Sequence, residues 1–174
     1  MTKNKRKIKE NAVSSAVEKA NIWLSPFGLC LEAESRKKGD GRLGEYEAGS
    51  IFEKTIQVVI YTDAIAESCA DEREFEREFL PFSELSDEED QIKLTIYHEL
   101  GHALVEQIID WMENLPEAAE IFTDDLCQKY HSVVDGEFDE ETLVENFAYA
   151  FMYGDDDEPL KSCFKELNNI FQTS

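Results

Sequence analysis

The sequence predicts an α+β domain that is mainly helical and carries a small mixed sheet. Six segments favour helices, whereas only two, residues 29–36 and 55–61, alternate as strands do. Both strands precede the helix at 86–114, which carries the sequence HELGH, and the sheet is expected to pack against that helix. No internal repeat, low-complexity linker or change of composition divides the chain. One domain spanning residues 1–174 is therefore expected.

Sequence signals mark the ends of several helices. Ser86 and Glu89 form a capping box at the start of the third helix, which should end near Asn114. Asp139 can cap the fifth helix, and Gly154 suits the position just after its end. The expected helices span residues 8–23, 64–79, 86–114, 116–132, 140–153 and 160–171.

The two strands differ in strength. Residues 55–61 (TIQVVIY) are typical of a strand, because their isoleucine and valine side chains alternate between two faces. Residues 29–36 alternate more weakly. The segment between the strands, 37–50, is rich in glycine and charge, and it predicts a turn or a hairpin.

The chain is strongly acidic, with a formal net charge of −22. Residues 1–10 are expected to be a flexible basic start: they hold five cations and one carboxylate, which leaves −26 for the remainder. Such a charge disfavours nucleic acid and anionic membranes, and it favours a basic protein or peptide as partner. Solubility alone is the alternative explanation for the charge.

The expected compartment is the cytoplasm. No apolar run is long enough to span a bilayer, and the basic start lacks the apolar region of a secretory signal. The four cysteines have no CxxC spacing, so they predict reduced thiols, mostly in the core, and not zinc ligands. They are Cys30, Cys69, Cys127 and Cys163.

A metal-binding pattern, HELGH, lies in the third helix. His98 and His102 are one turn apart, at about 40° around the helix axis, so both imidazoles can converge on one ion. Glu99 lies about 100° further round, where a carboxylate can take a proton from a metal-activated water. Apolar stripes on two sides of this helix predict a dry environment that favours neutral histidines. Two buried histidines bonded to carbonyls or carboxylates are the alternative.

Glu145 is the strongest candidate for a third ligand. It lies in the apolar sequence LVENFAYAF, where burial of a carboxylate is costly unless a cation compensates its charge. A zinc ion would provide that compensation. An exposed strip on the helix, or a lysine partner, is the alternative. His131, the third histidine of the chain, follows 29 residues after His102 on or near the end of a polar helix, and it suits the role less well.

HELGH followed by a helix with ENFAYAF resembles the gluzincin group of zinc metallopeptidases, and within it the anthrax lethal-factor-type peptidase domain. The resemblance implies a minimal zincin-like metallopeptidase domain and a zinc-dependent endopeptidase activity. By it, His98, His102 and Glu145 bind Zn²⁺ and Glu99 is the general base. The strand at 55–61 would be the edge that holds an extended peptide substrate. The chain is also similar, more weakly, to the repressor-cleaving ImmA/IrrE type, whose third-ligand glutamate usually follows sooner.

The chain departs from the family pattern at one position. Four residues after the third ligand, the lethal-factor type commonly has a second glutamate that contacts a histidine, whereas this sequence has Tyr149. A tyrosine hydroxyl can accept from an imidazole N–H but supplies no charge. Candidates for the group that stabilises the oxyanion are Tyr130, His131, Tyr149 and Tyr153.

A second, non-catalytic hypothesis has a different basis. The acidic surface and the unassigned oxyanion donor also fit a protein-interaction module on a degenerate zincin fold, with zinc kept for structure. A mimic of nucleic acid that occupies a basic protein's groove is one form of this hypothesis.

Overall fold

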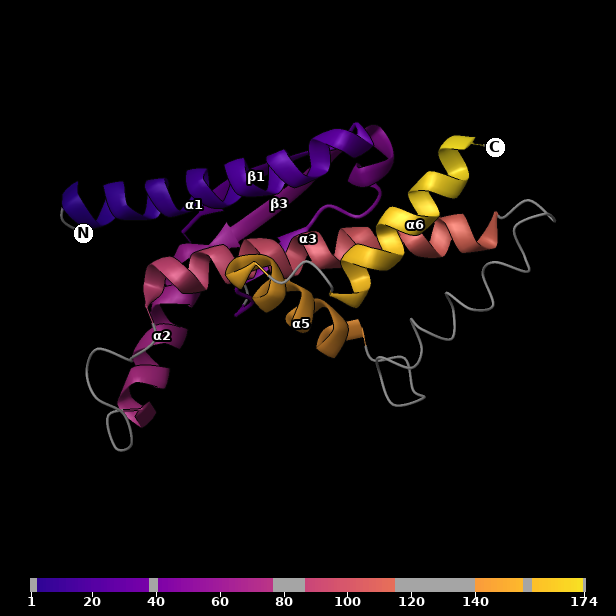
Figure 1. Ribbon diagram of the computed structural model, residues 1–174. Coiled ribbons are helices and arrows are strands. Elements are labelled where there is room, and N and C mark those ends of the chain that lie inside the picture. Colours follow the sequence, from indigo (N-terminus) through magenta and orange to yellow (C-terminus); the bar gives the residue numbers. More distant parts are fainter. Residues whose placement is uncertain (1–2, 38–40, 77–86, 115–139, 155–157, 174) are drawn as a thin grey trace.

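The computed structural model describes residues 3–37, 41–76, 87–114, 140–154 and 158–173 (Figure 1). The expected helix at 116–132, together with Asp139, Cys127, Tyr130 and His131, lies outside the described residues. Within them the fold is mainly helical with a three-stranded mixed sheet, which confirms the predicted α+β class. None of the helices in these ranges is long and apolar enough to cross a membrane.

Helix α1 (Lys3–Leu24) lies against the sheet and α3 (Figure 1). It begins at Lys3, so most of the basic start that was expected to be flexible is helical. Its buried face consists of small side chains one turn apart, at Ala12, Ala16 and Ala20. The larger side chain of Ile22, on the same helix, is 71 % exposed. Small alanine side chains let the helix approach its neighbours closely, and Val13 and Val17 pack partly buried beside them.

The sheet has the order β1-β3-β2, with β1 (Cys30–Arg36) parallel and β2 (Gly44–Tyr46) antiparallel to β3 (Thr55–Tyr61). Both long strands were predicted, and β2 lies in the segment expected to form a turn or hairpin. The expectation that residues 55–61 form the substrate-holding edge is wrong, because β3 is the central strand and pairs on both sides. The short β2 is an outer strand of this sheet.

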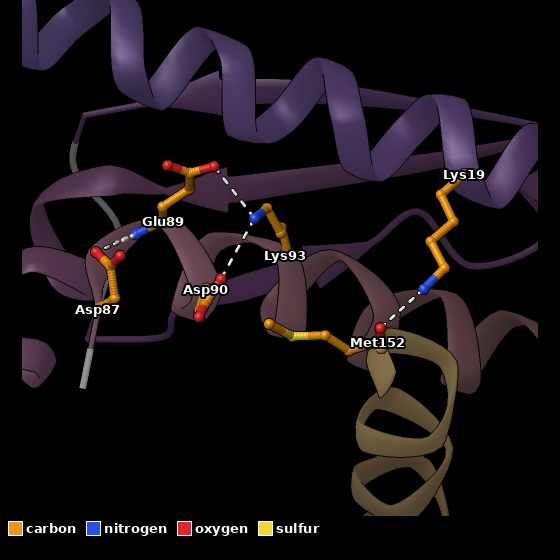
Figure 2. A network of polar contacts seen from close by, with 6 residues as sticks. All are labelled: Lys19, Asp87, Glu89, Asp90, Lys93 and Met152. Atoms are coloured by element: carbon orange, nitrogen blue, oxygen red, sulfur yellow. Dashed lines mark hydrogen bonds and ion pairs between the residues drawn. The ribbon is translucent and has the colours of Figure 1, made fainter. Parts of the chain in front are cut away.

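Helix α3 (Glu88–Glu113) is the centre of the fold and contacts α1, α2, α5, α6, β2 and β3. Its cap differs from the predicted one. Asp87 is the N-cap, and its side chain accepts a hydrogen bond from the backbone N–H of Glu89 at 3.2 Å, as Figure 2 shows. Ser86 lies outside the described residues. The C-cap, Asn114, is where the sequence placed the end of the helix.

The remaining elements complete the core. Helix α2 (Thr62–Glu76) follows β3 directly, and the short helices η1 (Ser25–Phe27) and η2 (Ser50–Glu53) precede β1 and β3. Helices α5 (Glu140–Tyr153) and α6 (Pro159–Thr173) pack on α3 and on each other. Gly154 follows α5 with a φ of 88°, as expected after a helix end. The side chains of Cys69 and Cys163 are buried, whereas that of Cys30 is exposed.

A lysine ties α5 to α1. The ammonium of Lys19 donates to the carbonyl oxygen of Met152 at 2.8 Å, at the C-terminal end of α5 (Figure 2). A cation is favourable at this end because the last carbonyls of a helix carry partial negative charge. The aromatic side chains of Trp23 on α1 and Phe147 on α5 also contact each other, with ring centroids 6.3 Å apart. The orientation of α5 is thus fixed at its end and along its length.

Helices α3 and α5 approach each other at Gly101, inside the HELGH sequence. A Cβ atom built at Gly101 would lie 2.9 Å from the Cβ of Val144 and 3.2 Å from the ring of Phe147. Carbon atoms in folded proteins do not come this close, so a side chain at this position would push the two helices apart. Glycine at this position is therefore a packing requirement of the fold.

We expect Gly101→Val to lower the free energy of unfolding by about 2 kcal/mol, a fall in Tm of roughly 4–8 °C, because an overpacked core must shift or strain. Thermal and urea unfolding followed by circular dichroism would measure this. Glu113→Val, at the exposed end of the same helix, is the matched control and should change little. Equal stability of the two variants would contradict close packing of α3 on α5.

Candidate metal centre

The two histidines of HELGH point at the same place. Nε2 of His98 and Nε2 of His102 lie 3.1 Å apart, with ring centroids separated by 4.8 Å. Two nitrogen ligands at about 2.0–2.1 Å from a tetrahedral zinc ion would be roughly 3.3 Å apart. The pair already has nearly this spacing, as the one-turn separation in the sequence predicted.

A third candidate ligand lies in the first turn of α5. The carboxylate of Glu141 has Oε2 3.4 Å from His98 Nε2 and Oε1 3.7 Å from His102 Nε2. Among the described residues, these three side chains form a group whose ligand atoms lie within 4.8 Å of one another. The distances between them resemble the edges of a tetrahedral coordination site, which shows that the residues present fit a metal ion.

Glu145, the third ligand implied by the family resemblance, lies one turn beyond Glu141 on α5. It lines the same cavity but is not a member of the three-ligand group. The expectation that its carboxylate is buried is wrong, because Glu145 is exposed and lies on the polar strip of the helix. Sequence reasoning missed Glu141 because this residue precedes the apolar part of α5. The signal available was its spacing: residues four apart share one helix face.

Glu99 lies beside the histidines and is buried. Burial, as the largest cause, raises the pKa of its carboxyl group to about 7, while a hydrogen bond from the backbone of Tyr46 acts in the opposite direction. Strand β2 passes directly over this carboxylate: a Cβ atom at Gly44 would lie 3.0 Å from Glu99 Oε1 and 2.7 Å from the Thr95 methyl carbon. Glycine at position 44 lets the strand approach the helix this closely.

The histidines differ in their surroundings. Burial lowers the pKa of His98, and the charge of His102 lowers it further, so the neutral imidazole is favoured. His102 is more enclosed: the ring of Tyr46 stacks on it with an angle of 9° between planes, and Glu140 Oε1 lies 2.6 Å from its Nδ1. Nothing in the sequence pattern had singled out Glu140 or Tyr46.

The two histidines and Glu99 line one open cavity of about 660 Å³ between β2, α3 and α5. Its wall carries the carboxylates of Glu45, Glu99, Glu141 and Glu145, while Arg42 is the cation among the described lining residues. A surface of this kind attracts cations. The cavity is wide enough to admit a small molecule or a segment of extended chain beside the histidines.

Two tyrosines considered for the oxyanion lie on α5. Tyr149 lines the cavity and is 47 % exposed, whereas Tyr153 is 72 % exposed and does not line it. Their rings stack with centroids 6.3 Å apart. The other two candidates, Tyr130 and His131, lie outside the described residues. Tyr149 is therefore the candidate that the structure brings to the site.

Comparison of the chain with models of protein families, with curated proteins and with solved structures gave no match. The resemblance to gluzincin metallopeptidases therefore remains a prediction carried by HELGH and ENFAYAF. The chemistry assigned to the cavity rests on the side chains that line it.

Proposed function

We propose that the protein is a zinc-dependent metallopeptidase that hydrolyses a peptide bond in the cavity between β2, α3 and α5. The observation that carries this proposal is the placement of His98 Nε2 and His102 Nε2, 3.1 Å apart and facing Glu141, next to the buried carboxylate of Glu99. Two imidazoles and one carboxylate, in a cavity with room for a further group, are the ligand set typical of catalytic zinc.

When bound, zinc would supply a Lewis acid that polarises the scissile carbonyl and lowers the pKa of a water molecule. His98, His102 and Glu141 would hold the ion. Glu99 would accept the proton of the attacking water at its carboxylate and deliver it to the leaving amine. The backbone of Tyr46 orients Glu99 by a hydrogen bond, and the burial that raises its pKa favours its protonated form after the transfer.

The substrate would lie along β2. This strand is an outer strand of the sheet, and residues 42–46 line the cavity. An extended peptide can pair with the backbone of such a strand, because an outer strand has one side not used within the sheet. The proposed peptide-holding strand is therefore β2, and not residues 55–61 as the sequence suggested.

We expect Glu99→Gln to retain zinc and to lose cleavage by at least about 10²-fold, because glutamine keeps the shape of the side chain but cannot take a proton. Zinc would be measured by mass spectrometry of the purified protein, and cleavage by mass spectrometry of a proteome-derived peptide library. Glu113→Gln, an exposed change on the same helix, is the control.

Cleavage by Glu99→Gln at the wild-type rate would end the proposal, as would a wild-type protein without stoichiometric zinc. Binding of zinc without cleavage of any library peptide by the wild type would favour the alternative, an acidic interaction module with structural zinc.

The third ligand can be identified by a matched pair of variants. We expect Glu141→Ala to weaken zinc binding at least about tenfold, because a carboxylate near both Nε2 atoms is lost, and Glu145→Ala to weaken it less. Competition with a chromophoric zinc chelator would measure both. The reverse order would identify Glu145 as the ligand, as the family resemblance implies.

A further inference from the structure

The contact between His102 and Glu140 uses Nδ1 of the imidazole, whereas the proposed metal would bind at Nε2. Oε1 of Glu140 lies 2.6 Å from Nδ1 of His102, which is a short, charge-assisted hydrogen-bond distance. Glu140 is the first residue of α5 and Glu141 is the second, so adjacent carboxylates reach different atoms of the histidines. The side chain of Glu140 is 37 % exposed, whereas that of His102 is only 13 % exposed.

A carboxylate at Nδ1 determines which nitrogen of a neutral imidazole carries the proton. An ionised carboxylate can only accept, so Nδ1 must donate and Nε2 keeps its lone pair. In this structure the lone pair of His102 Nε2 then faces His98 Nε2, which is where the proposed metal would lie. The same contact holds the imidazole in the orientation that directs this lone pair at the proposed metal position.

The ring of His102 is also held in its plane. Tyr46 stacks on it with ring centroids 5.9 Å apart, and the segment that follows β2 is tied to α3, because Glu106 accepts from the backbone N–H of Gly49 at 2.9 Å. His98 has no comparable hydrogen-bond partner at Nδ1 within the described ranges. The two histidines of the pair are therefore held unequally.

We propose that Glu140 is a positioning residue: it fixes His102 in the Nδ1–H tautomer and thereby sets the affinity of the site for zinc. This inference rests on the proposed metal site, but its first consequence does not, because the tautomer of His102 exists in the metal-free protein. The competing arrangement is a doubly protonated His102 paired with Glu140, whose Nε2–H would donate to His98.

Nitrogen-15 NMR of the imidazole rings distinguishes these states, and the chain has only three histidines. In the metal-free wild type at pH 8, we expect His102 as a neutral ring protonated at Nδ1. Glu140→Ala should shift His102 toward the Nε2–H tautomer. Glu140→Gln should lie between the two, since its amide oxygen can still accept from Nδ1 but carries no charge.

Zinc affinity is the second measurement. Competition with a chromophoric chelator should show binding weakened about 10- to 100-fold in Glu140→Ala and less in Glu140→Gln. Glu166→Ala, which removes an exposed carboxylate from α6, is the control for a change of net charge. Circular dichroism would confirm that each variant keeps its helices. Glutamine lacks the charge of glutamate at the helix start, just as alanine does. An effect of the helix dipole alone would therefore weaken zinc binding equally in Glu140→Gln and Glu140→Ala.

The outcomes separate this inference from the proposed function. An Nε2–H or doubly protonated His102 in the metal-free wild type, or equal zinc affinity in wild type and Glu140→Ala, would overturn the role of Glu140 even if the protein cleaves peptides. A protein that binds zinc with the expected dependence on Glu140, yet cleaves nothing with Glu99 intact, would support the positioning role and contradict the peptidase.

Discussion

The site depends on one packing constraint, the contact of α3 with α5 at Gly101. The glycine lies between Glu99 and His102, and the side chains of Val144 and Phe147 occupy the space that a Cβ atom would need. Because the helices meet here, the first turn of α5 reaches the face of α3 that carries the histidines. The apolar contact at Gly101 and the polar side chains beside it therefore lie on the same pair of helices. A displacement of α5 along α3 would change both.

The carboxylates of the cavity explain why a bound cation would stabilise this site. Glu99, Glu141 and Glu145 line one cavity of a chain whose net charge is −22, and carboxylates brought together repel one another. Burial alone already raises the pKa of Glu99. A divalent ion between the histidines and Glu141 would offset this repulsion. The cavity thus joins a His–His–Glu group that could bind a metal ion to an outer strand of the sheet.

The sequence predicted the helices and strands more accurately than the contacts between them. Local periodicity predicted features that the structure contains. They are the strands at 29–36 and 55–61, the end of the long helix at Asn114 and the convergence of His98 with His102. Strand β2 has only three residues and contains Gly44, so it has no alternating pattern to detect. Its pairing with β3 joins residues that are far apart in the sequence, and this pairing makes β3 the central strand. Glu140 and Glu141 lie in a polar helix start, where acidic residues are common for reasons of capping alone.

The sequence by itself determined that two imidazoles share one helix face with a carboxylate beside them, because helical spacing is a local property of the chain. Only the tertiary structure decided which carboxylates of α5 meet them. That choice depends on how far α5 slides along α3, and hence on the fit of Gly101 against Val144. A shift of one helical turn would exchange Glu145 for Glu141 beside the two histidines, and local sequence cannot fix such a shift because both residues occupy the same face of α5.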